Sequence, residues 1–375
     1  MAVAPVPRRS AAVVAERLGN QLLAVPVSVP RRVGRGTRGE SGAGAVVEVV
    51  GRILAVQAQD GRGARLAVRS RTTGCTAAVV DRALTQRRLV VSWLNRGTLH
   101  LVRAEDEPWL HLLCAPRTVA GNARRLGQEG VSALQADHGV DVIVQAVTDD
   151  GPLTRHQLRD RLDAAGIPTA GQALVHLLVA ATLRGHIVRG PMVARDHAFV
   201  SVEQWLGPRP IIERDDALAR LARGYLAGHG PAGPSDLATW AGLPLGDARR
   251  ALSAIAASGE TEDRGDDLVA LGPPPRRALA FPSPRLLGPF DPILHGWVSR
   301  SELVGPHQGI VTTNGVFRPV ALVDGRAVAT WGLADGTITV RSLEPISAAT
   351  RRALETDAAD VLGYLDLPPK PVAWT

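Results

Sequence analysis

Apolar residues at helical spacing mark the first stretch of the chain that is predicted to be buried. Val46, Val49, Val50 and Ile53 fall on one stripe of a helix, and this spacing predicts a helix over residues 45–56. An apolar stripe of this kind is buried against other elements rather than exposed to solvent.

Two amide side chains follow this helix and are the candidate site. Gln57 and Gln59 come directly after it, and Gly61 and Gly63 are predicted to break the helix beyond them. Residues two apart do not face each other on a helix, whereas in an extended segment they point the same way. If both amides serve one site, the chain must therefore unwind near Val56. The alternative is that both are ordinary polar residues at an exposed helix end.

The order helix, helix, hairpin recurs along the chain, and it is the order of a winged-helix unit. The first hairpin joins two apolar runs around Asn95-Arg96-Gly97. The helices are expected at residues 11–24, 45–56, 76–86, 153–166, 171–183, 217–227, a short one from 234, and 245–258, and the hairpins at 89–102, 186–201 and 261–271. We therefore expect an α+β fold with three tandem winged-helix units that form a concave DNA cradle, over residues 1–125, 126–210 and 211–271.

Beyond a proline-rich hinge at 272–275, the chain turns β-rich. The strands are expected at 309–313, 316–323, 326–331 and 337–343, followed by a last helix at 348–355. Asn-Gly and Asp-Gly pairs between the strands are typical of tight hairpin turns. Residues 272–375 should thus form an antiparallel β-rich region that ends with a helix.

Charge and composition narrow the class of partner. The 375 residues carry a formal net charge of +7, which favours a polyanion, nucleic acid first. The two cysteines are too few for a four-cysteine metal site, and the histidines lack metal-binding spacing, so we expect no metal and no cofactor. The sequence contains no run of eighteen apolar residues and no signal peptide, so we expect a cytoplasmic protein with no membrane span.

Four motifs, in this order, resemble the AlkZ/YcaQ-type winged-helix DNA glycosylases. They are the segment 56–60 with its Gln-Ala-Gln, the hairpin 93–102, the segment 290–296, and Phe317-Arg318-Pro319 followed by Val323-Asp324-Gly325. The resemblance implies tandem winged helices, excision of bulky or crosslinked alkylated purines, and often self-resistance to a DNA-alkylating antibiotic. It also implies that Gln57 and Gln59 are catalytic. Ile293 stands where the family pattern leads us to expect part of an acidic-aromatic pair, which argues against a role for the 290–296 loop.

Neutral amides suit this chemistry. An N7- or N3-alkylated purine is cationic and already a good leaving group, so two amide oxygens can stabilise the sugar cation and position a water. Asp60 could orient the amides or accept the proton of the water. Thr98 and His100 share one strand face and could contact the lesion, although an ordinary exposed polar face is the alternative.

Arginines supply the expected DNA contacts. Four follow the glutamines and a fifth lies at the hairpin turn: Arg62, Arg65, Arg69, Arg71 and Arg96. A solvated basic face is the alternative for the four. The basic segment 26–44 could be a phosphate-contacting arm or a linker. Because aromatic residues make up only 3%, we expect no stacking platform for single strands and no aromatic cage around the lesion.

The lysine count bears on the mechanism. A glycosylase that also cleaves the strand attacks the sugar with an amine. Lys370 is the only lysine, and both it and the N-terminal amine lie far from the glutamines in sequence. We therefore predict a monofunctional enzyme that acts as a monomer on double-stranded DNA carrying an alkylated purine. The alternative is a winged-helix transcription regulator without catalytic activity.

Overall fold

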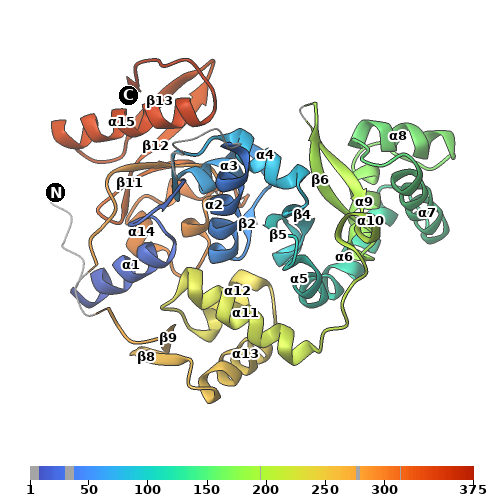
Figure 1. The fold of residues 1–375 in the computed structure, drawn as a ribbon, viewed down its shortest axis with the longest axis horizontal. Coiled ribbons are helices and arrows are strands. Elements are labelled where there is room, and N and C mark those ends of the chain that lie inside the picture. Colours follow the sequence, from blue (N-terminus) through green and yellow to red (C-terminus); the bar gives the residue numbers. More distant parts are fainter. Residues whose placement is uncertain (1–7, 30–37, 195, 276–278, 313) are drawn as a thin grey trace. The chain divides into compact units, whose positions relative to one another are not determined.

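The computed structural model describes residues 8–29, 38–194, 196–275, 279–312 and 314–375 (Figure 1). It is an α+β structure, as predicted, and its chain divides into two compact units. Unit 1 combines Met1–Val80 with Ala219–Thr375, and unit 2 is Asp81–Leu218. Among the described helices, none has the length and apolar character needed to cross a bilayer.

The N-terminal part of unit 1 contains short helices and strands. In order they are α1 (Arg8–Asn20), β1 (Val27–Ser28), α2 (Arg38–Ile53), β2 (Val56–Gln57), α3 (Gly61–Arg69), β3 (Thr72–Thr73) and the start of α4 (Ala77–Thr85). The predicted helix at 45–56 is the second half of α2 and ends three residues earlier. Within the basic segment 26–44, residues 30–37 lie outside the described residues.

Helix α3 corrects one expectation. Gly61 and Gly63 were expected to break a helix, yet α3 begins at Gly61. The side chain of Asp60 accepts a hydrogen bond from the Gly63 backbone N–H at 2.6 Å and so caps the first turn. Gly63 must be small, because a β-carbon there would lie 2.6 Å from the Pro289 carbonyl oxygen. The two glycines therefore reflect a close approach at a helix start.

The C-terminal part of unit 1 begins within α11 (Arg214–His229). It continues with α12 (Pro234–Ala241), α13 (Leu245–Ala257), the hairpin β8 (Thr261–Gly265) and β9 (Leu268–Leu271), β10 (Arg285–Leu287), α14 (Ser301–Val304), β11 (Val320–Val323), β12 (Arg326–Ala334), β13 (Thr337–Ser342), α15 (Ala348–Tyr364) and β14 (Ala373–Trp374). The sheet order is β10-β11-β12-β13-β14, and only β13 and β14 run parallel. The turns at Asp324-Gly325 and Asp335-Gly336 have positive φ at both residues, as tight hairpins require.

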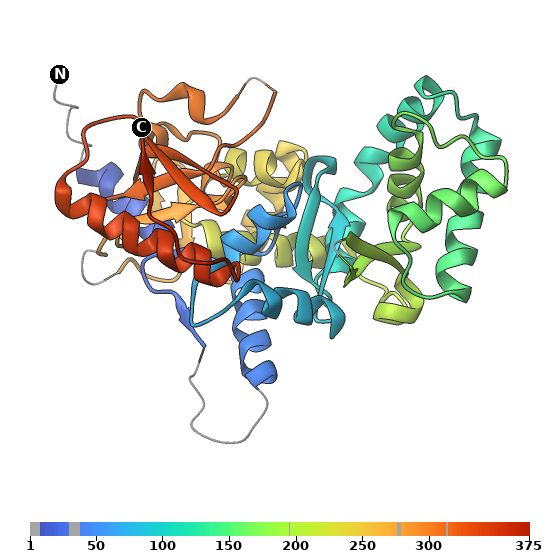
Figure 2. The same ribbon diagram turned by 90° about the horizontal axis from the view of Figure 1, so that it is seen from above.

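Several details of the β-rich region differ from prediction, among them the unpredicted strand β14. The expected strand at 309–313 is wrong: Gln308–Ile310 is a 3-10 turn, and Val311 makes only an isolated bridge to Phe317. Strand β10 was not predicted, and α15 continues nine residues past its expected end at residue 355. Helix α15 packs along the sheet (Figures 1 and 2), where Leu354, Ala358 and Val361 share a core with Leu286 and Ala321.

Unit 2 contains four antiparallel strands in the order β5-β4-β6-β7 and a group of helices. Its elements are β4 (Leu89–Trp93), β5 (Leu99–Arg103), α5 (Glu107–Cys114), α6 (Pro116–Gln128), α7 (Ala133–Asp149), α8 (Arg155–Ala164), α9 (Ala173–Leu183), β6 (Ile187–Val193), β7 (Asp196–Ser201) and α10 (Val202–Leu206). Both predicted hairpins are confirmed, and the Thr154 hydroxyl caps α8 by accepting from the Gln157 N–H. Helices α5 to α7 were not predicted. The assignment of three winged-helix units stays a prediction.

Candidate active site

The glutamine segment leaves α2 through an abrupt turn. Helix α2 ends at Ile53, and the buried Leu54 adopts a left-handed backbone with φ of 69°. The Ala55 N–H then donates to the Ile53 carbonyl at 2.9 Å, and Val56 and Gln57 form the extended strand β2. The chain is thus unwound at Val56, as a shared site for both amides requires.

Two glycines of α11 hold this turn in place. A β-carbon at Gly228 would lie 2.3 Å from the Arg52 carbonyl oxygen, and one at Gly224 would lie 3.0 Å from both terminal methyls of Leu54. Helix α11 therefore lies in backbone contact with the end of α2, at a separation that only glycine permits. This contact fixes where the segment that carries Gln57 begins.

The two amides differ in environment. The Gln57 side chain is buried at 5% exposure, and its Oε1 has no hydrogen-bond partner among the described residues. Gln59, by contrast, is exposed. A buried acceptor without a donor costs free energy in the folded state, so it calls for an explanation, of which a catalytic role is one. Gln57 therefore has the stronger structural signature of the two.

The four arginines after the glutamines separate into two pairs. Arg62 is exposed, and Arg65 is half-buried and donates to the Gly61 carbonyl at 2.7 Å. Arg69 and Arg71 are buried at 3% and 0% exposure, so they are not on a surface that can meet DNA. The continuous basic stripe expected from the sequence is therefore corrected to Arg62 and Arg65 alone.

The two buried arginines hold unit 1 together. Arg69 contacts Asp357 and Asp360 of α15; burial alone would lower its pKa, but these carboxylates outweigh burial and raise it. Arg71 forms a bidentate pair with Asp291 at 2.8 and 2.9 Å, with both side chains fully buried. The 290–296 loop thus has a structural role, although its departure from the family pattern argued against a role for this loop.

Gln21 extends the Arg71 contacts toward α11. Its Oε1 accepts from Arg71 at 2.7 Å, and its Nε2 donates to the Gly228 carbonyl at 2.9 Å. Gln21 therefore links the buried ion pair to the helix that supports the glutamine segment. Sequence reasoning missed this role, because nothing local distinguishes Gln21 from a surface glutamine.

The remaining predicted site residues lie in unit 2. Arg96 is exposed at the hairpin turn with φ of 55°. The Thr98 hydroxyl donates to the Asn95 carbonyl at 3.0 Å, and the His100 Nδ1 lies 3.0 Å from the Thr98 carbonyl. His100 is buried at 2% exposure, and Leu99 and Leu101 beside it are buried too. The expectation that His100 emerges on an open strand face is therefore wrong, because both faces of β5 are covered.

Comparison with known proteins agrees with the resemblance found in the sequence. The family model described as DNA glycosylase AlkZ-like matches residues 50–364. The chain belongs to the AlkZ-like DNA glycosylase family. It is 28% identical over 338 residues to the interstrand DNA cross-link repair glycosylase of Streptomyces sahachiroi, covering 84% of this chain and 89% of that one.

A solved structure extends the likeness to the fold. The Streptomyces sahachiroi DNA glycosylase AlkZ matches with a TM-score of 0.77 and 25% identity, over 98% of this chain and 99% of that chain. The predicted resemblance is thereby confirmed, and the AlkZ-like chain is a DNA repair enzyme whose substrate is DNA. The regulator alternative is not favoured.

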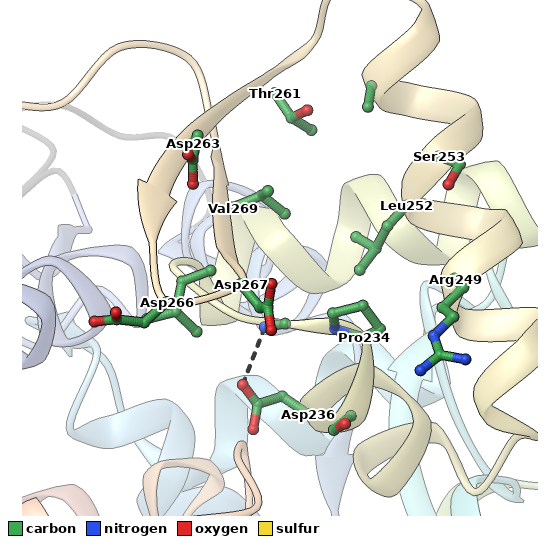
Figure 3. Close-up of a pocket in the computed structure, with 14 residues that line it drawn as sticks. Pro234, Asp236, Arg249, Leu252, Ser253, Thr261, Asp263, Asp266, Asp267 and Val269 are labelled. Atoms are coloured by element: carbon green, nitrogen blue, oxygen red, sulfur yellow. Dashed lines mark hydrogen bonds between the residues drawn. The ribbon is translucent and has the colours of Figure 1, made fainter.

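A separate hollow of unit 1 does not suit a DNA backbone. It measures about 660 Å³ and is bounded by α12, α13 and the β8–β9 hairpin (Figure 3). Four carboxylates line it together with Arg249: those of Asp236, Asp263, Asp266 and Asp267. Because phosphates bind cationic side chains, this acidic lining disfavours a phosphate in the hollow. Among the described residues, no group of three or more His, Cys, Asp or Glu is placed to hold a metal ion.

A buried histidine behind the glutamine segment should make folding sensitive to acid. Burial, with smaller contributions from His295, Arg71 and Arg17, lowers the pKa of His229 from 6.5 to about 3. On acidification, His229 therefore takes up a proton near pH 6.5 in the unfolded chain but only near pH 3 in the folded chain. This histidine costs no stability above pH 6.5, and between pH 6.5 and 3 it reduces stability by about 1.4 kcal/mol for each pH unit of acidification.

Replacement of His229 by phenylalanine should remove this slope. The new ring keeps the stacking on Tyr225, whose centroid lies 4.8 Å from that of His229, and it cannot take up a proton. Urea denaturation at pH 7.5, 5.5 and 4.5 measures the effect. We expect the variant to lose less stability than the wild type on acidification, and equal losses would show that His229 is not the acid-sensitive group.

Proposed function

We propose that this chain is a monofunctional DNA glycosylase that hydrolyses the N-glycosidic bond of bulky or crosslinked N7- or N3-alkylated purines in duplex DNA. The observation that carries this proposal is the buried Gln57 Oε1, an acceptor with no donor in the described part of the chain. Its relative from Streptomyces sahachiroi is named for interstrand cross-link repair, which favours crosslinks and bulky adducts as substrates. Self-resistance to a DNA-alkylating natural product is the biological role we propose.

The chemistry follows from neutral amides beside a cationic leaving group. An alkylated purine departs with its bonding electrons and becomes neutral, so no strong acid is required. The Gln57 Oε1 dipole lies in a buried environment, where it stabilises the positive charge that develops on the sugar more strongly than it would in water. Gln59, exposed and two residues on, accepts a hydrogen bond from the attacking water.

Asp60 has a positioning role in this proposal. It caps α3 with the hydrogen bond to Gly63, and this fixes the direction in which the chain leaves Gln59. We assign DNA backbone contacts to Arg62, Arg65 and Arg96, and a lesion contact to Thr98. We further propose that the recurring helix–helix–hairpin segments are tandem winged helices that form a cradle for a single duplex, with the protein acting as a monomer.

The position of the only lysine supports a reaction without a strand-cleaving step. The Lys370 Nζ donates to the Asp335 carbonyl at 2.7 Å in the turn between β12 and β13. An amine engaged in a hairpin turn is a poor candidate to attack C1′ of a sugar. Hydrolysis by water then leaves an intact strand with an abasic site.

One assay tests both the activity and the mechanism. The wild-type protein is incubated with duplexes that carry N7-methylguanine, a bulky N7-guanine adduct or an interstrand crosslink, with and without borohydride. Alkali then cuts at any abasic site. We expect alkali-dependent cleavage of the bulky or crosslinked duplex and no covalent protein–DNA product. A borohydride-trapped product would contradict monofunctional chemistry. No base release, together with tight binding to one undamaged sequence, would favour the regulator.

A further inference from the structure

Phe290 is held in a backbone conformation that an aromatic residue avoids. Its φ is 57°, in the left-handed region, where a β-carbon approaches the following carbonyl oxygen at a cost of about 1–2 kcal/mol. Residues held in such a conformation cluster at functional sites, because the surrounding structure must supply the free energy that maintains them. Glycine would remove the strain, so the side chain of Phe290 needs an explanation.

The surrounding structure fixes this residue from several sides. Its N–H donates to the Phe317 carbonyl at 3.2 Å, and its own carbonyl lies 3.0 Å from the His295 Nε2. The next residue, Asp291, is locked by its bidentate pair with Arg71. Phe290 is thus preorganised before any ligand binds.

The same loop lies directly against the glutamine segment. An ideal β-carbon on Gly63 would be 2.6 Å from the Pro289 carbonyl oxygen and 3.4 Å from the Asp60 β-carbon. Pro289 and Asp60 therefore contact the same point at the start of α3. Phe290 follows Pro289 in the chain, and Gln59 precedes Asp60.

Its ring belongs to an aromatic and cationic layer. Phe290 is half-buried and packs against Phe317, with ring centroids 5.9 Å apart. Phe317 in turn receives the edge of His295 at 5.4 Å and the Arg300 guanidinium at 5.7 Å. Two of the four phenylalanines in the chain thus meet beside the candidate active site.

We propose that Phe290 stacks against a nucleobase next to the damaged nucleotide and so selects the distorted duplex. This inference rests on the proposed glycosylase function and deepens it. Stacking on an aromatic face is tolerant of sequence, as repair of lesions in any context requires. It also stabilises the unstacked state that access to a damaged base demands. One ring on one side is not an aromatic cage, so a bulky adduct still has room.

Four variants separate stacking from packing. Phe290→Gly removes the ring and relieves the strained backbone, so the fold should survive. Phe290→Tyr keeps an aromatic face, and Phe290→Leu keeps apolar bulk without one. Asp335→Gly is the matched control, because Asp335 also has a positive φ, 49°, but lies exposed in the β12–β13 turn. Melting temperatures of all four proteins show whether each is folded.

Two readouts are measured on each variant. The first is the single-turnover rate of base release, and the second is the fluorescence of 2-aminopurine placed beside the lesion, which rises when that base unstacks. We expect Phe290→Gly and Phe290→Leu to lower base release about 10–100-fold, in line with loss of one stacked base. Phe290→Tyr and Asp335→Gly should remain close to the wild type. The fluorescence increase on wild-type binding should be absent with Phe290→Gly.

The outcomes that overturn the inference differ from those that overturn the proposed function. Full activity of Phe290→Leu, or a fluorescence increase that survives in Phe290→Gly, would show that the ring only packs. If the wild-type protein releases no base, the glycosylase proposal fails. In that case an unchanged 2-aminopurine signal on binding would reject the stacking contact as well.

Discussion

Replacement of Gln57 by leucine should abolish most base release while leaving the protein as stable as the wild type or more stable. Leucine has a similar volume and fills the same buried position, and it removes the Oε1 acceptor that has no partner in the described structure. Substituting an apolar group for an unpaired buried polar group is neutral or stabilising. Loss of one preorganised dipole at the reacting centre lowers the rate about 10²–10³-fold.

Gln21→Leu is the matched control for this result. Gln21 is also a buried glutamine, but its amide is paired at both ends, with Arg71 at 2.7 Å and with the Gly228 carbonyl at 2.9 Å. Its replacement should therefore destabilise the protein, by about 1–3 kcal/mol for the groups left unpaired.

Single-turnover rates and urea denaturation of both variants measure the contrast. A Gln57→Leu protein that is markedly less stable than the wild type, or that still releases base at the wild-type rate, would contradict the assignment. Gln59→Leu, at an exposed position, should lower the rate without changing stability.

Replacement of Asp291 by alanine should destabilise unit 1 by about 3–5 kcal/mol, because it leaves the charge of Arg71 buried and uncompensated. Both side chains of this pair are at 0% exposure, and Asp291 also accepts from the Ile293 N–H at 3.1 Å. The loss is large relative to the total stability of a typical domain, so a lower melting temperature and a lower yield of folded protein are expected.

A solvent-exposed ion pair is the control for Asp291. The Arg223 Nε and the Glu260 Oε2 lie 2.6 Å apart, with side chains 43% and 32% exposed, so Glu260→Ala should cost much less stability than Asp291→Ala. The double variant Arg71→Met with Asp291→Leu should recover part of the loss, since apolar residues can replace a buried pair. Equal urea midpoints for Asp291→Ala and Glu260→Ala would show that the buried pair contributes no more than a surface one.

Local signals in the sequence were sufficient for many of the elements. The Asn95-Arg96-Gly97 turn between two apolar runs predicted β4 and β5, and the helix expected at 153–166 is α8, which Thr154 caps. Both rest on interactions within a few residues, which a single sequence contains. The family resemblance predicted Gln57 and Gln59 as the site; their catalytic roles stay a prediction.

Other features depend on partners far along the chain. In the sequence nothing distinguishes the four arginines that follow the glutamines, Arg62, Arg65, Arg69 and Arg71. In the structure Arg69 binds Asp357 and Arg71 binds Asp291, and each of these partners lies more than two hundred residues later in the chain. Gly63 was interpreted as a helix breaker because its actual reason, the close approach of Pro289, depends on a residue that is equally remote in the sequence. Helix α6 was missed because only Asn122 and Leu126 on it are buried, which is too few for an apolar stripe.

The two separate pieces of chain that form unit 1 have a consequence for the order of folding. During synthesis the glutamine segment leaves the ribosome early, but α11, the 285–296 loop and α15 that support it are made only after the whole of unit 2. Contacts across such a separation form late, because the ends of a long loop must be brought together first. Unit 2 is a continuous stretch of chain, so it is able to fold before the later segments that pack against residues 1–80 have been made. A chain truncated after residue 218 should therefore contain a folded unit 2 and a protease-sensitive N-terminal segment.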